Sequence, residues 1–468
     1  MHVVVIGGGI SGLAAAEELL RSDSRVRVTL IDAAATLGGM IGTERHDGYV
    51  IETGPDVLLA AKPAGIEFCA RVGVGDRLQG TAPAGRAFVR RGTRLDRLPS
   101  GLSGLVPAET GPLLGSRLLR WSGKVRALAE PLVPRRRDGA EESVEAFVTR
   151  RLGREMYEWL VEPLLSGIFA GDGSRLSINA AFPQLKAWET QYGSLVRGAR
   201  RRKPAPGSAF VSLPGGLAEL VDATVATLCA SGRTAIRSGT LVRSVGAAYG
   251  AQPVVVLDAG ERLTADAVIV AASPAATAGL IHDEAPEAAR LLTGMPASSV
   301  AIVTLGYDSA SIRRPLDATG YVVPRADPGP VLACTWSSAK FPGRAPAGKA
   351  LLRVFFGGGG REAAARQADD WLLAEARHEI ETVLGASGDP ELVRVVRWTD
   401  AMPQYTLGHR ARVEAVREQV SRRPWLALAG NAYEGVGIPD CIRSGQRAAR
   451  RVLDARTSGA TEPIGAPA

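Results

Sequence analysis

The chain has 468 residues, of which 46% are hydrophobic and 22% charged, a composition typical of a globular protein large enough for two or three domains. Its net charge of +8 permits anionic partners, but no nucleic-acid-binding motif is present, so no nucleic-acid partner is expected. The cysteines, Cys69, Cys229, Cys334 and Cys441, form no C-x-x-C pair, which argues against a disulfide framework and a metal site.

A strand, a glycine-rich loop and a helix are predicted at the start of the chain. Residues 3–6 are an apolar β-branched run, residues 7–12 read Gly-Gly-Gly-Ile-Ser-Gly, and residues 13–20 favour a helix. This order matches the G-x-G-x-x-G fingerprint, whose glycines turn the chain, admit a pyrophosphate and let the helix pack on the strand. The helix N-terminus would then offer free N–H groups and a partial positive charge to the pyrophosphate.

A second strand, residues 26–31, ends at Asp32, 20 residues after Gly12. A carboxylate at that position accepts hydrogen bonds from ribose hydroxyls. The pair Gly38-Gly39 then resembles the second glycine turn of glutathione-reductase-2 type FAD enzymes. That group usually has Glu where this chain has Asp32, and often Arg where it has Met40, so the match is weaker there.

The remainder of the chain alternates between helical and strand patterns. Helix formers dominate residues 100–206, and residues 204–207 indicate a linker. Charged clusters at 135–137 and 200–203 are interpreted as exposed loops, with contact to an anionic bilayer as the alternative. The other expected elements are a hairpin at 241–245 and 253–257, strands at 267–271, 300–305, 350–356 and 426–429, an amphipathic helix at 361–384 and a helix at 439–455.

These elements predict an α/β protein with a dinucleotide-binding domain interrupted by two insertions. The FAD-binding Rossmann domain is expected to combine residues 1–62, 208–285 and 420–455. A helical cap that could face a membrane is assigned to residues 63–207, a mixed-sheet substrate domain to residues 286–419, and a disordered tail to residues 456–468.

Five motifs in the same chain resemble the oxygen-dependent porphyrinogen oxidases, which act on protoporphyrinogen IX or coproporphyrinogen III. The resemblance covers nearly the whole chain and is most specific at residues 430–442, Gly-Asn-Ala-Tyr-Glu-Gly-Val-Gly-Ile-Pro-Asp-Cys-Ile. The other matching segments are Glu52–Asp56, Glu162–Asp172, Thr335–Pro342 and Pro403–His409.

The resemblance implies non-covalently bound FAD, because no cysteine or histidine stands in an evident attachment motif. The second glycine loop precedes a helix near Pro439, whose positive end would stabilise an anionic reduced flavin. The cofactor-binding residues that it implies are Gly7, Gly8, Gly9, Ile10, Ser11, Gly12, Asp32, Gly39, Thr53, Gly54, Pro55, Asp56, Val242, Trp398, Val436, Gly437 and Ile438. For Val242 and Trp398 an ordinary place in the core is the alternative.

The implied reaction aromatises a porphyrinogen in three rounds. A hydride leaves a meso carbon for the flavin, an N–H proton is lost, and O2 accepts the electrons as H2O2. Aromatisation drives the reaction, so no strong side-chain base is needed; the protein orients a large apolar disc, holds its carboxylates and excludes water.

Three residues are candidates for contact with the substrate or its protons. Gly167 would line the ring and is assigned both a catalytic and a substrate-binding role, against the alternative of a helix-breaking glycine. Lys62 stands where the family places a basic residue near a substrate carboxylate, against a solvated surface lysine. His409 is the candidate proton carrier, against a structural histidine.

Coproporphyrinogen III is favoured over protoporphyrinogen IX because the chain is rich in Ala, Gly and Arg and has no evident membrane anchor. More distant alternatives are an amine oxidase, a phytoene-desaturase-like enzyme and a non-catalytic nucleotide-binding scaffold. The first strand begins too early to leave room for a targeting peptide, which predicts a cytoplasmic enzyme. Peripheral membrane contact and downstream haem-pathway enzymes are the further partners considered.

Overall fold

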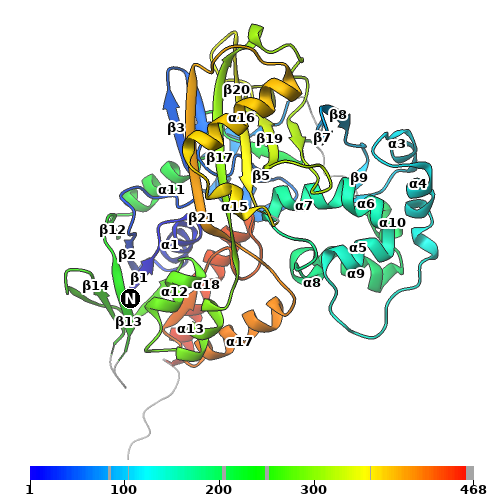
Figure 1. The fold of residues 1–468 in the computed structure, drawn as a ribbon. Coiled ribbons are helices and arrows are strands. Elements are labelled where there is room, and N and C mark those ends of the chain that lie inside the picture. Colours follow the sequence, from blue (N-terminus) through cyan, green and yellow to red (C-terminus); the bar gives the residue numbers. More distant parts are fainter. Residues whose placement is uncertain (83–85, 104, 203–206, 248–251, 359, 460–468) are drawn as a thin grey trace, which may run out of the picture.

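The computed structural model describes residues 1–82, 86–103, 105–202, 207–247, 252–358 and 360–459. The expected linker at 204–207 therefore lies outside the described residues except for Gly207. The same holds for most of the turn between the two hairpin strands and for residues 460–468 of the expected tail. Figure 1 shows three parts: a parallel sheet with its helices, a long mixed sheet and a block of helices beside it.

Both ends of the chain build the parallel sheet. Its five strands are ordered β12-β2-β1-β16-β22, and every neighbouring pair is parallel. Val3 pairs with Val28 on one side and with Ala267 on the other. The strands are β1 (His2–Ile6), β2 (Arg27–Ile31), β12 (Thr234–Arg237), β16 (Ala267–Val270) and β22 (Leu426–Leu428).

Strand alternation distributes the buried side chains of this sheet over two cores. Val3 and Val5 pack against one set of helices, whereas Val4 and Ile6 pack against another. The first set is α1 (Ile10–Ser22), α2 (Pro63–Arg71), α11 (Ala218–Ala230) and α18 (Ile438–Gly459). The second is α12 (Pro274–Leu280), α13 (Pro286–Thr293) and α17 (His409–Ser421), joined by the small sheet β13 (Val242–Gly246), β14 (Val254–Leu257) and β15 (Arg262–Thr264).

The second large sheet has seven strands in the order β21-β17-β20-β19-β18-β7-β8. It is mixed, because β18 and β7 run parallel while its other neighbours are antiparallel. The strands are β7 (Phe88–Arg91), β8 (Arg94–Arg97), β17 (Ala297–Asp308), β18 (Gly320–Val322), β19 (Val331–Trp336), β20 (Lys349–Gly357) and β21 (Leu392–Pro403). One face is covered by α15 (Glu362–Ala365) and α16 (Asp369–Leu384).

The helical block has its own core around a buried ion pair. Arg151 and Glu130 are both inaccessible to solvent, and the Glu130 carboxylate also accepts the Leu195 N–H at 2.9 Å. The block contains α3 (Thr110–Gly115), α4 (Trp121–Leu128), η2 (Glu130–Leu132), α5 (Val144–Leu152), α6 (Arg154–Met156), η3 (Tyr157–Val161), α7 (Glu162–Phe169), α8 (Ile178–Ala181), α9 (Pro183–Tyr192) and α10 (Leu195–Arg201).

Short elements complete the described chain. They are the strand pairs β3 (Thr43–His46) with β4 (Tyr49–Glu52) and β9 (Leu102–Ser103) with β10 (Val106–Pro107), the sheet of β5 (Leu58–Leu59), β6 (Gln79–Gly80) and β11 (Phe210–Ser212), and the helices η1 (Gly75–Arg77), η4 (Ser309–Ser311) and α14 (Ser337–Lys340).

The described elements depart from the sequence expectations at three places. Two parts of the expected cap at 63–207 pack elsewhere: α2 contributes Phe68 to the core of the parallel sheet, and β7 and β8 extend the mixed sheet. The helix α18 continues to Gly459, into the tail expected to be disordered from 456. The exact domain boundaries remain predictions.

The third departure is that the single helix expected at 361–384 is two helices. The chain is extended at Ala368, between α15 and α16. Arg397 on β21 donates to the Gln367 carbonyl and also pairs with Asp369. This tertiary contact uses a carbonyl that a continuous helix would need.

Candidate functional site

The loop between β1 and α1 is built so that only glycine fits at its ends. Gly7 has φ of +103°, and a Cβ there would lie 2.4 Å from the Ala271 carbonyl oxygen. A Cβ on Gly12 would lie 1.8 Å from the Gly7 carbonyl oxygen. These contacts press the first turn of α1 against the loop, as a dinucleotide fold requires.

Asp32, at the end of β2, holds the middle of this loop. Its carboxylate accepts the Gly8 N–H at 2.5 Å and the Ala34 N–H at 2.7 Å. The Gly38 N–H donates to the Gly8 carbonyl at 2.9 Å, which brings the second glycine turn alongside the first. Each carboxylate oxygen can still accept a ribose hydroxyl.

The double turn leaves open the backbone that a pyrophosphate would approach. A Cβ on Gly9 would meet only the Gly39 Cα, at 3.8 Å. Gly9 is also the N-cap of α1 and makes no side-chain cap, so the helix leaves its first N–H groups to an anion. Ile10 and Ser11, in that first turn, are buried. The structure therefore brings residues 7–12, Asp32 and Gly39 together.

The segment 53–56 follows the second turn and is held from three directions. The Thr53 N–H donates to the Gly42 carbonyl at 2.9 Å, and the Trp398 Nε1–H donates to the Thr53 carbonyl at 2.8 Å. Arg353 donates to the Gly54 carbonyl at 2.6 Å. Trp398 is thus next to the segment with which it was predicted to share a cofactor.

Buried charges surround Asp56. Lys340 Nζ lies 2.7 Å from its carboxylate, Arg353 lies 3.8 Å away, and Arg344 pairs with Glu52 at 3.1 Å. Burial acts to raise the pKa of Asp56, but the Lys340 ammonium and the Arg353 guanidinium outweigh it and hold this pKa below its usual value. This group, which we call the buried charge cluster, has three cations and two carboxylates.

Sequence reasoning missed the cationic members of this cluster. Lys340 belongs to the matching segment Thr335–Pro342 but has no predicted role, and neither Arg344 nor Arg353 is among the predicted site residues. The signal was present for Arg353, since it interrupts the apolar run at 350–356. Leu352 and Val354 point to the core of the mixed sheet, so the alternation of β20 turns Arg353 toward Gly54.

The second glycine loop, residues 430–437, leads into α18. Gly435 has φ of +144°, and a Cβ there would lie 2.5 Å from the Asp440 carboxyl carbon. The Asp440 N–H donates to the Gly437 carbonyl at 2.9 Å. Val436 packs against the core of the helical block, whereas Ile438 packs into the core of the parallel sheet, so the loop lies where these two parts join.

Lys62, the predicted carboxylate-binding lysine, is near this loop. Its ammonium donates to the buried Asp440 carboxylate. Asp440 also accepts from Arg443 at 2.8 Å. A substrate carboxylate that binds Lys62 would therefore have to share its ammonium with Asp440 or displace Asp440 from it.

Gly167 lies in α7 and leaves open space on its surface. A Cβ there would meet only Val322 Cγ1, at 4.0 Å, and the neighbouring Ile168 is 48% exposed. A flat molecule could approach the helix backbone at this position. The arrangement is compatible with the predicted lining role and also with an ordinary helical glycine.

His409 and Val242 occupy the core. His409, the first residue of α17, is buried, and neither ring nitrogen forms a hydrogen bond to a described residue. Burial, together with the Arg412 guanidinium, lowers the pKa of His409 to about 4, so the ring is neutral at pH 7. Val242 packs beneath the parallel sheet in the same core as Ile31.

The buried cysteine at the start of α18 is not poised for chemistry. Burial raises the pKa of Cys441 to about 12, which leaves its thiol protonated at neutral pH. Among the described residues, no group of His, Cys, Asp and Glu side chains is arranged to hold a metal ion.

Comparison with known proteins identifies the architecture. The family of flavin containing amine oxidoreductases matches residues 10–453. Coproporphyrinogen III oxidase of Bacillus subtilis is 35% identical to this chain over 97% of it and 98% of the relative. Human protoporphyrinogen oxidase is 33% identical over 96% of this chain and 98% of the relative.

Solved structures agree. A crystal structure from Exiguobacterium sp. 255-15, provisionally named a protoporphyrinogen oxidase, matches with a TM-score of 0.84 and 32% identity, covering 97% of this chain and 99% of that chain. Reduced UDP-galactopyranose mutase, at 16% identity, has a TM-score of 0.72 with 98% of this chain and 96% of that chain covered, and shows the fold alone. The predicted family and fold are confirmed: the chain belongs to the flavin containing amine oxidoreductases and, within them, to the porphyrinogen oxidases.

Proposed function

We propose that the chain is an FAD-dependent oxidase that converts a porphyrinogen to the aromatic porphyrin in haem biosynthesis, with coproporphyrinogen III as the favoured substrate. Dioxygen is the electron acceptor and H2O2 the product. The observation that supports this most strongly is the full-length similarity to the Bacillus subtilis coproporphyrinogen III oxidase. The steric closure of the loop at 7–12 and the hydrogen bond from Trp398 to Thr53 support it.

The proposed chemistry asks little acid–base work of the protein. Bound flavin supplies a two-electron acceptor for the hydride of a meso carbon. The chain positions the cofactor through the loop at 7–12 and Asp32, and Gly167 leaves room for the flat face of the substrate. Lys62 would pair with a propionate, and the buried charge cluster would favour negative charge on the reduced cofactor.

Protoporphyrinogen IX is the second candidate substrate, because human protoporphyrinogen oxidase is almost as similar to this chain. The two substrates differ in carboxylate number, four against two, so their comparison also tests Lys62. An amine oxidase or phytoene-desaturase-like activity is the more distant alternative on the same fold.

The decisive experiment is turnover of both porphyrinogens by the purified protein, followed by porphyrin fluorescence, oxygen uptake and peroxide formation. We expect flavin bleaching on anaerobic addition of the preferred porphyrinogen and recovery of its colour in air. For each porphyrin formed, about three molecules of O2 should be consumed and about three of H2O2 produced. No fluorescence gain with either compound would refute the proposal, and fluorescence without peroxide would refute O2 as the acceptor.

We also propose that the flavin is FAD, bound without a covalent bond. Cys441, close to the second glycine loop, is a buried thiol that stays protonated at neutral pH. Acid precipitation should release the flavin into the supernatant, where chromatography identifies FAD. Colour that stays with the precipitate contradicts this.

We also propose that the enzyme is cytoplasmic and makes peripheral contact with a membrane. In the part of the chain that the structure describes, no helix combines the length and apolar character needed to cross a bilayer. However, Trp121, Val125 and Leu132 on the helical block are 70%, 64% and 83% exposed. Apolar side chains next to the exposed Arg120 suit an anionic bilayer surface. Co-sedimentation with anionic and with neutral vesicles tests the membrane contact. Co-sedimentation with a downstream haem-pathway enzyme tests that second proposed partner.

A further inference from the structure

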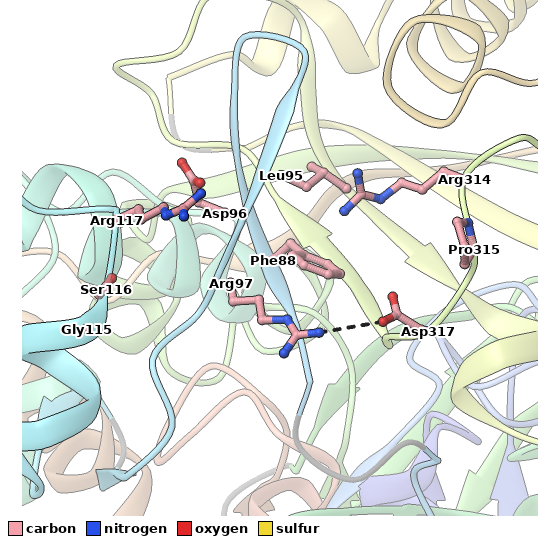
Figure 2. A pocket seen from close by; sticks show the side chains of 10 residues that line it. All are labelled: Phe88, Leu95, Asp96, Arg97, Gly115, Ser116, Arg117, Arg314, Pro315 and Asp317. Carbon is pink, nitrogen blue, oxygen red and sulfur yellow. Dashed lines mark ion pairs between the residues drawn. The ribbon is translucent and has the colours of Figure 1, made fainter.

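A cavity of about 560 Å³ lies at the β8 edge of the mixed sheet. Figure 2 shows its three walls: the β7–β8 hairpin, the link between α3 and α4, and a segment before β18. The helical block and the mixed sheet therefore both contribute to it. The lining residues are Phe88, Leu95, Asp96, Arg97, Gly115, Ser116, Arg117, Arg314, Pro315 and Asp317.

The aromatic floor of this cavity faces away from Gly167. Tyr321 pairs with Phe88, and Val322 pairs with Val89 in the parallel register of β18 and β7. Val322 reaches toward Gly167, so Phe88 points to the opposite face of the sheet. None of the lining residues belongs to the proposed flavin or porphyrinogen site.

Positive charge in the cavity exceeds what its carboxylates neutralise. Arg117 and Arg314 have no carboxylate partner among the described residues. Arg97 reaches Asp317 at 3.8 Å, across the lower part of the view in Figure 2. Asp96 faces Arg94 at 3.6 Å. An acidic ligand would therefore meet two guanidinium groups that are free to bind it.

Arg314 is incompletely paired within the protein. Its Nε is buried and forms no hydrogen bond to a described residue, although an unmade buried hydrogen bond costs about 1–3 kcal/mol. Its guanidinium lies 5.1 Å from the Phe88 ring centroid, and Figure 2 shows it directed into the cavity. Beside it, Phe88, Leu95 and Pro315 offer an apolar surface for a flat molecule.

We propose that this cavity is a second ligand site, for an aromatic molecule that carries acidic groups. The aromatic body packs on Phe88 and Leu95, and the acidic groups bind Arg314 and Arg117. Such a ligand bridges the helical block and the mixed sheet without entering the flavin site. The proposal is independent of the substrate proposed above.

The test is calorimetric titration of the flavin-loaded protein with naphthalene-2,6-dicarboxylate as the probe. We expect binding in roughly the micromolar to millimolar range, as for a small ligand with few contacts. Arg314→Gln and Arg117→Gln should each weaken it by about tenfold, because each removes a charge-assisted contact. Arg290→Gln, which removes an exposed arginine on α13, is the matched control and should leave the affinity unchanged.

Two further arms make the result decisive. Arg117 is exposed, so its variant is expected to fold even if Arg314→Gln does not. Phe88→Leu should weaken the aromatic probe but not inorganic phosphate. The proposal would be overturned if the probe does not bind, or if it binds the wild type and both arginine variants equally. A probe-induced change in the flavin spectrum that survives both substitutions would also overturn it.

Discussion

The His409 ring stacks on the Tyr405 ring, with centroids 4.0 Å apart and planes inclined by 13°. The Tyr405 hydroxyl in turn accepts the Gly435 N–H at 2.8 Å and donates to the Asn431 carbonyl. One stacked pair thus connects the start of α17 to both sides of the second glycine loop. The relationship assigns His409 a positioning role that its neutral ring can perform.

Replacing Tyr405 by Phe should loosen that loop while keeping the stack. The change leaves the Gly435 N–H without its partner, so we expect the free energy of unfolding to fall by about 1–3 kcal/mol. Flavin should also dissociate faster on dilution. Urea denaturation and flavin fluorescence measure the two effects, and Tyr192→Phe, on α9, is the control. Unchanged flavin release in Tyr405→Phe would contradict this role.

The His409 ring should make the protein less stable in acid. Its pKa is about 4 when folded and 6.5 in its ordinary state, so below pH 6.5 the unfolded chain binds a proton that the folded chain does not. Stability is therefore lost as pH falls from about 6.5 to about 4, by up to about 3 kcal/mol.

The variant His409→Phe isolates this contribution. The difference in the free energy of unfolding between wild type and variant should change with pH between about 4 and 6.5 and be constant above pH 6.5. A difference that is flat throughout would show that His409 titrates normally. If His409 instead carries a proton in turnover, the variant should lose activity at pH 7 with its stability unchanged.

The dinucleotide part was predictable because its signals are local. The apolar runs at 3–6, 267–271 and 426–429 become β1, β16 and β22, and the glycines at 7–12 specify the loop by steric necessity. That both chain ends share a sheet followed from the strand and helix patterns at the two ends of the chain. The pairing of β1 with β16 rather than with β22 could not be predicted in this way, because strand order depends on tertiary packing.

The buried charge cluster and the helix break show where sequence reasoning stops. Arg353 reaches Gly54 across 299 positions. Its place in an apolar run marks it as unusual, but nothing local to either residue identifies the other as its partner. Likewise, Arg397 on β21 donates to the Gln367 carbonyl in the break between α15 and α16. Both are side-chain contacts between distant segments, which override local propensity.

Gly12→Ala should prevent flavin binding and destabilise the fold. The added Cβ would lie 1.8 Å from the Gly7 carbonyl oxygen, and backbone must move to relieve the clash. We expect little flavin in the purified variant and a lower midpoint of thermal unfolding. The control is Gly279→Ala on α12, where the added Cβ meets no atom within 4 Å. A flavin-replete Gly12→Ala protein would contradict the assigned loop geometry.

Gly167→Ala should separate substrate binding from stability. The Cβ has room, and alanine favours a helix over glycine by about 1 kcal/mol, so stability should stay equal or rise. If a flat substrate packs on this position, KM should increase several-fold with flavin content unchanged. Kinetics and calorimetry on one preparation measure both. A normal KM would favour a merely helical glycine.

The buried charge cluster should set the flavin reduction potential. Removing its positive charge by Lys340→Met disfavours the anionic reduced cofactor, whereas Asp56→Asn removes negative charge and favours it. The two variants should therefore shift the midpoint potential in opposite directions, each by about 30 mV, equivalent to a tenfold change for a two-electron couple. Lys349→Met, at a half-buried lysine paired with Glu391, should not change it. Shifts of the same sign in both variants would mean that the substitutions act through misfolding rather than through charge. The variant Lys340→Arg keeps the positive charge, so it should have the wild-type potential only if charge is the cause.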